Sequence, residues 1–187
     1  MITILRAAAL AAALALPALS AVPVFGEDTV MVGGAAMYPS KNIVENAVNS
    51  PIHTTLVAAV QAAGLVDALS GPGPFTVFAP VNRAFAALPA GTVDTLLLPE
   101  NKGMLTKVLT AHVASGNWSA EALKAEADKN GGSFSFATLS GDTLTVQVIG
   151  ARLFVMDESG GVARITTSDV NQSNGVIHVV DKVLLPK

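Results

Sequence analysis

The sequence predicts an α+β fold in which an antiparallel sheet or sandwich is packed by helices. In the first part of the chain, apolar residues recur at helical spacing, and from Phe134 onward the spacing changes to the two-residue period of strands. The chain has 187 residues and no internal repeat. We therefore expect a single structural unit rather than an array or several domains.

The helical part is expected to begin near Ile43, with Ser40 or Asn42 as the N-cap. A second helix should end at Gly64, and a short turn should lead to the breaker at residues 71–74. Asn82 is expected to cap a short helix that follows the next strand. Further helices are expected at residues 93–97, 104–112 and 119–129.

The strand before Asn82 spans residues 75–79 and should place Val77 and Ala79 on one face and Phe78 on the other. The last apolar run, residues 176–185, is apolar on both faces, as is typical of a strand buried on two sides. Between them, short strands are expected at residues 134–136, 144–148, 153–155 and 162–166.

Residues 1–21 have the layout of a secretory signal peptide, with one positive charge before an apolar run and small residues after it. Cleavage is expected after Ser20, Ala21 or Gly26. The apolar run is shorter than the roughly 20 residues of a membrane span, so we expect no stable membrane insertion after cleavage. Residues 22–40 show no period and are expected to form a flexible tether, which leaves residues 41–187 as the domain.

Composition excludes several classes of function. The formal net charge is −3 and the sequence pI is about 5.5, so the chain lacks the basic surface that nucleic acid or an anionic membrane would require. It has no cysteine, which removes disulfides, thiolate nucleophiles, zinc ribbons and iron–sulfur clusters.

The histidines are the main candidates for chemistry. A metal site would bring His112 and His178 together with a carboxylate such as Asp181. The simpler interpretation is that both are buried and hydrogen-bonded to the main chain, since each lies on an apolar face. His53 lies at the start of a helix and is expected to be solvated.

Other candidate sites are weaker. A hydrolytic triad can be composed from Ser168, Asp169 and His178, but nothing in the local sequence positions the serine. The turn carboxylates at Asp142 and residues 157–158 could bind calcium, although such groups are usually only solvated.

Trp118 is the only tryptophan and lies between the end of one expected helix and the start of the next. It is expected either to anchor a partner at the surface or to pack over the helix junction.

Two segments resemble the signature boxes of fasciclin domains. The first is Gly73-Pro-Phe-Thr-Val-Phe-Ala-Pro-Val-Asn-Arg-Ala-Phe-Ala-Ala-Leu88, and the second is Ser173-Asn-Gly-Val-Ile-His-Val-Val-Asp-Lys-Val-Leu-Leu-Pro186. Between them, Leu105-Thr-Lys-Val-Leu-Thr-Ala-His-Val113 is similar to the helix that carries the Tyr-His pair of the family, with Ala111 in place of the tyrosine. The resemblance covers residues 41–187.

This resemblance implies a β-wedge or sandwich packed with several short α-helices, and it implies mainly structural roles for the signature residues. In animal relatives the surroundings of the Tyr-His pair are linked to integrin-dependent adhesion, and Ala111 departs from that pattern. Residues 117–132 look longer than the corresponding stretch of a typical bacterial relative. The signature residues are Phe75, Thr76, Phe78, Ala79, Pro80, Asn82, Phe85, His112, Asn174, Gly175, His178, Val179 and Asp181.

The expected function is that of a secreted or periplasmic module that is not an enzyme and needs no cofactor or metal. By resemblance it would act in cell adhesion or in association with the matrix or envelope, with a protein or polysaccharide as its partner and loops on a rigid scaffold as the contact. The alternative is an exported carrier of a small apolar ligand, such as a lipid or pigment, bound in a cleft beside the wedge.

Overall fold

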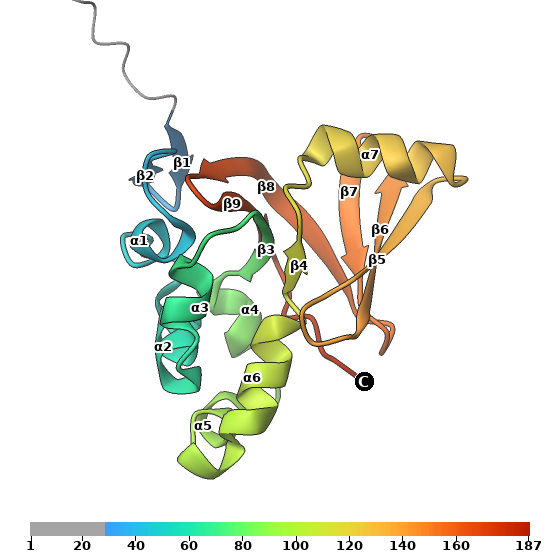
Figure 1. Cartoon of the computed structure of the whole chain (residues 1–187). Helices are drawn as coiled ribbons and strands as arrows, with labels where there is room; N and C mark the ends of the chain where they lie inside the picture. Colours follow the sequence, from blue (N-terminus) through green and yellow to red (C-terminus); the bar gives the residue numbers. More distant parts are fainter. Residues whose placement is uncertain (1–28) are drawn as a thin grey trace, which may run out of the picture.

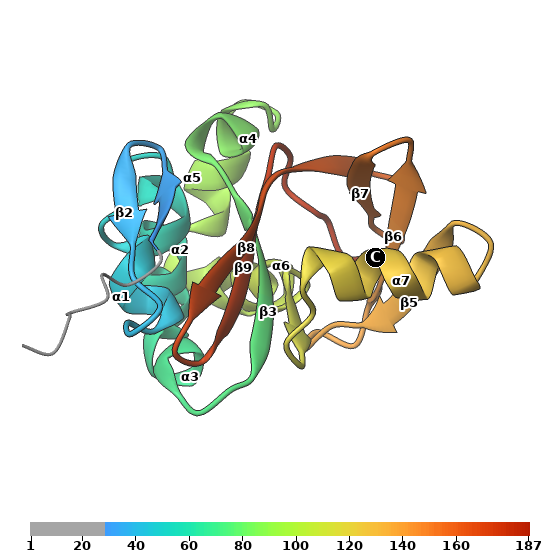
Figure 2. The ribbon, with the colours of Figure 1, turned by 90° about the horizontal axis from the view of Figure 1, so that it is seen from above.

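Strands β3 (Phe75–Pro80) and β9 (Gly175–Val180) form the centre of the molecule. The computed structural model describes residues 29–187. Figure 2 shows β3, β8 and β9 between a group of helices on one side and α7 with β5–β7 on the other. The helices are α1 (Ile43–Ala47), α2 (Thr54–Ala63), α3 (Val66–Ser70), α4 (Asn82–Ala86), α5 (Thr92–Leu96), η1 (Pro99–Asn101), α6 (Lys102–Thr110) and α7 (Ala120–Lys129). The other strands are β1 (Val30–Val32), β2 (Ala35–Met37), β4 (Val113–Ser115), β5 (Ser133–Ala137), β6 (Thr143–Ile149), β7 (Arg152–Met156) and β8 (Val162–Gln172).

The main sheet has the strand order β4-β3-β9-β8-β7-β6-β5. The expectation of an antiparallel sheet was wrong at its centre, because β3 and β9 pair in parallel while the other neighbours are antiparallel. A bridge between Ala114 and Thr138 brings the end of β5 back to β4, so the sheet curls into a nearly barrel-shaped wedge (Figure 1). The fold is thus α+β, as predicted.

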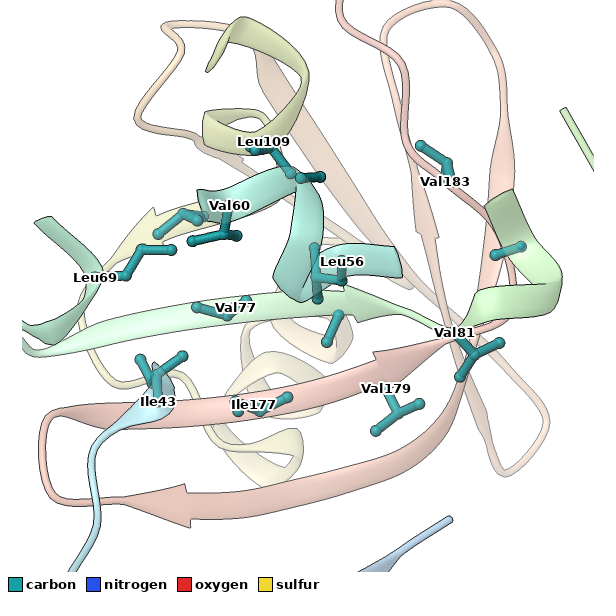
Figure 3. Packing of buried hydrophobic residues seen from close by; sticks show 14 of the residues in the cluster. Ile43, Leu56, Val60, Leu69, Val77, Val81, Leu109, Ile177, Val179 and Val183 are labelled. Atoms are coloured by element: carbon teal, nitrogen blue, oxygen red, sulfur yellow. The ribbon is translucent and has the colours of Figure 1, made fainter. Parts of the chain in front are cut away.

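The alternation of side chains along β3 separates two hydrophobic cores. Val77 and Ala79 belong to the core shared with the helices, whereas Phe78 belongs to a second core inside the wedge. Figure 3 shows Val60 and Leu109 gathered over Val77 in the helical core. The predicted faces of β3 are confirmed, and so is the burial of β9 on both sides. The strand predicted to continue to Leu185 ends at Val180, and residues 181–185 lie outside it.

Residues that close the wedge come from α7 and from the last segment of the chain. Leu123 and Ala127 of α7 are fully buried, and Leu123 packs in the second core beside Phe78 and Val180. Ser119 caps the helix by accepting a hydrogen bond from Ala122 N. The segment 117–132, whose purpose the sequence left open, therefore covers one side of the wedge.

Several element boundaries were predicted and others were not. Asn42 caps α1 in a capping box with Glu45, and Gly64 ends α2 in the left-handed conformation. Residues 30–37, expected to be part of a flexible tether, form the β1–β2 hairpin, whose residues Val32 and Met37 are buried. The hairpin strands have only three residues each, so no period could develop in the sequence.

Two further expectations were corrected at helix ends. The stretch expected to be a short turn before residue 71 is helix α3. Met104 was placed on the apolar stripe of α6, but its side chain is 62% exposed, and the buried stripe consists of Leu105, Val108 and Leu109. The signal peptide and its cleavage sites lie outside the described residues.

Gly175 is required by the close approach of the two central strands. A Cβ atom added there would lie 2.0 Å from the carbonyl oxygen of Phe75, which is far inside van der Waals contact. We expect Gly175→Ala to lower the free energy of unfolding by at least about 2 kcal/mol, because β3 and β9 would have to separate locally. Urea denaturation measures this change.

Gly103 provides the matched control, because it lies in α6 and an added Cβ would meet no atom within 4 Å. Gly103→Ala should raise stability by up to about 1 kcal/mol. Equal losses in the two variants would contradict the packing argument.

Candidate functional site

The two signature segments meet on the wedge-facing side of the parallel pair. Phe78 is the register partner of His178, and their ring centroids are 5.6 Å apart. On its other side Phe78 stacks on Phe136 at 5.9 Å. The main-chain N–H of Phe78 donates to His112 O at 2.9 Å, which ties the end of α6 to the same strand. Three of the signature residues, Phe78, His112 and His178, thus meet in one buried cluster.

Both ring nitrogens of His178 are used by main-chain groups. Its Nε2 donates to Trp118 O at 2.7 Å, and its Nδ1 accepts from Asp169 N at 3.4 Å. Asp169 adopts a positive φ of 57° at an irregularity of β8, and its carboxylate accepts from Ala120 N at the start of α7. His178 and Asp169 therefore position α7 on the wedge.

His112 is used in the same way at the other end of the cluster. Its Nε2 accepts from Leu184 N at 2.9 Å, so its Nδ1 carries the proton and donates to Val108 O at 2.8 Å. Asp157 accepts from the next main-chain N–H, that of Leu185, at 2.8 Å. Together they fix the segment that follows β9.

Burial keeps these rings neutral. Loss of solvation lowers the pKa of His112 to about 4, against smaller raising effects of the Val108 carbonyl and the Asp157 charge. Burial likewise lowers the pKa of His178 and of His53. The prediction that His112 and His178 are buried and bonded to the main chain is confirmed.

The expectation for His53 was wrong. Its side chain is buried, and its Nδ1 is 2.7 Å from Ser50 Oγ. Val32 and Met37 of the β1–β2 hairpin line the same small cavity as His53, and the local sequence could not indicate this arrangement.

The residues considered for metal or hydrolytic chemistry are not assembled for it. Among residues 29–187, no group of three His, Cys, Asp or Glu side chains is placed to hold a metal ion. Asp181 instead accepts from Arg164 N at 2.8 Å and pairs with its guanidinium at 3.6 Å. Asp157, considered for calcium, accepts hydrogen bonds from Gly161 N and Leu185 N. His178 has no free nitrogen with which to activate Ser168.

Thr76 and Trp118 link β3 to the loop that precedes α7. Thr76 Oγ1 donates to Gly116 O at 2.7 Å and accepts from Trp118 N at 2.9 Å. The half-buried indole packs against Phe134 with centroids 5.3 Å apart, and its Nε1 donates to Ser115 O. The structure shows the indole packed at the helix junction, and contact of its exposed part with a partner stays a prediction.

Asn82 was predicted to cap its own helix, and this was wrong. Asn82 is the first residue of α4, and its Oδ1 accepts from Thr55 N in the first turn of α2 at 3.0 Å. Its Nδ2 donates to Pro51 O and to Thr54 Oγ1. Asn82 therefore caps another helix across the fold, since the β3 chain end lies beside the start of α2.

Asn174 performs a similar role at the other end of the central strands. Its Oδ1 accepts from Ile43 N at the start of α1, and its Nδ2 donates to Leu69 O and Gly71 O at the end of α3. Residues distant in sequence thus hold the helix termini to the sheet. The remaining signature residues are at least partly buried in these cores: Phe75, Ala79, Pro80, Phe85 and Val179.

An apolar cleft opens on the helical side of β3, and His112 is one of its lining residues. Its volume is about 230 Å³, and its walls come from α1, α2, α3, α6, β3 and β4. The sequence indicated several of these residues, such as Val77 and His112, only as core residues and predicted no cleft on this side of β3.

The fold and the converging signature residues define a fasciclin-type module. The family model described as "Fasciclin domain" matches residues 51–186, and the chain belongs to this family. Protein sll1483 of Synechocystis sp. is 48% identical over 160 residues, which cover 86% of this chain and 82% of that protein. The cell surface glycolipoprotein MPB83 of Mycobacterium bovis is 34% identical over 83% of this chain and 64% of its own length.

A solved FAS1 domain pair from the insect cell adhesion molecule fasciclin I has the same fold. The TM-score is 0.70 at 17% identity, over 79% of this chain and 52% of that one. Within residues 29–187, no helix combines the length and the apolar character that a membrane crossing needs.

The neutral His112 makes stability depend on pH. In the unfolded chain the His112 ring takes up a proton near pH 6.5, and in the folded chain only near pH 4. The contribution of this ring to the free energy of unfolding is therefore complete above pH 6.5 and is lost as the pH falls toward 4. We expect this group to lower the free energy of unfolding by about 3 kcal/mol between pH 7 and pH 4. The His112 ring proton in NMR spectra should not shift above pH 5, whereas it should titrate near 6.5 in a urea-denatured control. A folded-state midpoint near 6.5 would contradict the assignment.

The cap that Asn82 provides to α2 can be tested against Asn101, which is buried to a similar degree but donates a single side-chain hydrogen bond. Asn82→Ala should cost about 2 kcal/mol because it removes the acceptor for Thr55 N and two donated hydrogen bonds. Asn101→Ala, which removes one exposed bond to Thr95 O, should cost about 0.5 kcal/mol. Urea denaturation measures the loss of stability in both variants. Equal losses would show that the cap of α2 by Asn82 stabilises the fold no more than a single exposed hydrogen bond does.

Proposed function

We propose that this chain is a non-enzymatic interaction module of the extracytoplasmic space that binds a protein or polysaccharide of the cell envelope or matrix. The observation that carries the proposal is membership of the fasciclin family. One relative is named a cell surface glycolipoprotein, and the solved domain pair comes from a cell adhesion molecule. Both names support a role in surface association.

The use of polar groups inside the fold supports a binding role over catalysis. In His112 and His178, both ring nitrogens are hydrogen-bonded to main-chain groups. The side chains of Asn82 and Asn174 form hydrogen bonds with helix ends. These side chains rigidify the scaffold and leave no activated nucleophile or base among themselves. The partner is therefore expected to contact the exposed loops and helices, because binding residues on rigid scaffolds commonly lie in such segments.

Export is the first requirement of this function. In the native host, the mature chain should begin at Ala21, Val22 or Glu27, which correspond to cleavage after Ser20, Ala21 or Gly26. Intact mass of the protein recovered from the periplasm and the medium measures this directly. Recovery only from the cytoplasm, with Met1 or Ile2 still present, would contradict an extracytoplasmic role.

The partner class can be identified by co-sedimentation of the processed protein with envelope fragments of its own host. We expect saturable binding that survives 0.5 M salt, because the chain carries only 13% charged residues. Loss of binding after protease treatment of the fragments would indicate a protein partner, and loss after periodate oxidation a polysaccharide. Failure of every envelope and matrix fraction to retain the protein would overturn the proposal.

Trp118 is the proposed contact within this function. Because its ring also packs on Phe134, the informative change is Trp118→Phe, which keeps an aromatic ring there and removes the indole N–H. Retention on envelope fragments should fall several-fold while the urea midpoint changes little. Unchanged retention would assign Trp118 to packing alone.

A further inference from the structure

The apolar cleft between the helices and β3 reaches from the surface into the core. Val48 and Gln61 are exposed at its outer end, and Val77, Phe78 and Leu109 are buried at its inner end. Figure 3 shows Leu69, Val60 and Val77 directed into the space between α2, α3 and β3. The cleft is thus a cavity with one open side rather than a flat apolar patch.

The lining determines what part of a ligand can enter. Gln61 and His112 are the only polar side chains among the lining residues. Gln61 lies at the surface, and the nitrogens of His112 are already bonded to Val108 O and Leu184 N. A polar atom carried to the bottom of the cleft would therefore lose its water without gaining a partner, at a cost of several kcal/mol. Only the hydrocarbon part of a ligand fits there.

The size and the side-chain types narrow the ligand further. A cavity of about 150 Å³ lined by aliphatic and aromatic side chains holds the six carbons of benzene, so about 230 Å³ holds roughly nine carbons. Phe78 is the only lining phenylalanine, and its ring packs in the wedge core with Phe136 and His178. The remaining walls are valine, leucine, isoleucine and alanine, which pack on a flexible chain and offer no ring for stacking.

We propose that this cleft binds one alkyl or acyl chain, with about nine carbons buried and the polar end of the molecule in water beside Gln61. The proposal goes beyond the interaction module, because the cleft and the surface partner are separate sites. It gives the carrier function considered from the sequence a defined place and a defined ligand class. The occupant is a single-chain amphiphile, and the buried length is limited by the cavity volume.

Primary alcohols of six to twelve carbons are suitable probes, because their hydroxyl end is small and uncharged. The protein should be expressed with its complete N-terminal sequence and used in the form that its host produces. Titration calorimetry should show one site, with affinity rising about fourfold per methylene up to about nine carbons and levelling beyond that length. In methyl-labelled protein, the NMR signals of Val60, Val77 and Leu109 should shift, and those of Val146 and Val155 in the wedge should not.

Two tryptophan substitutions separate the cleft from general surface effects. Val48→Trp places a large ring at the mouth, where the native side chain is 52% exposed, so the fold should tolerate it. Val162→Trp on β8 is the matched control, because that valine is also exposed and does not line the cleft. Decanol binding should weaken at least tenfold in Val48→Trp and remain unchanged in Val162→Trp. If Val48→Trp lowers the thermal midpoint, Gln61→Trp at the same mouth replaces it.

Three outcomes would overturn the proposal: no binding of any alcohol up to its solubility limit, equal weakening in both tryptophan variants, or affinity that still rises steeply between ten and twelve carbons. None of these depends on envelope retention. Failure of the cleft and failure of the interaction module are therefore distinguishable.

Discussion

The parallel pairing of β3 with β9 is the constraint on which the rest of the structure depends. These strands approach so closely that the Phe75 carbonyl occupies the place of a side chain at Gly175. Both faces of the pair are buried, so side chains that point to either side of each strand must be largely apolar. One set packs in the helical core and the other in the wedge core. The helices cover one face, and α7 with the curled sheet covers the other.

Burying a strand pair on both faces creates a problem for the polar groups around it, and the signature residues solve it. Main-chain groups at helix ends and at irregular loops have no regular partner in such a core, and leaving them unpaired would cost several kcal/mol each. Thr76 satisfies Trp118 N and Gly116 O, Asn174 satisfies the ends of two helices, and the neutral histidines bridge segments on either side. The residues that look most like chemistry in the sequence thus act as internal hydrogen-bond partners.

The sequence predicted local features well, because capping and alternation depend on near neighbours. Asn42, Gly64 and the two faces of β3 are of this kind, and so is the change of period at Phe134. Prediction from the sequence failed where the interacting residue lies far away along the chain. Asn82 caps α2 rather than α4, His53 is enclosed by a hairpin of three-residue strands, and the parallel pair joins segments about 100 residues apart. The cleft belongs to this second class, since its walls come from six separate elements.

The two cores are packed differently, and this difference bears on where a ligand could enter. In the wedge, Phe78, Phe136 and the side chains of α7 are in direct contact, and residues such as Val146 and Val155 have no exposed surface. The helical core is assembled from short helices, several of only five residues, which cannot each present a complete apolar face. Short helices around one strand leave space between their side chains that longer helices would fill. The sheet therefore supplies rigidity, and the incompletely filled helical core is the part of the fold that can accept an apolar guest.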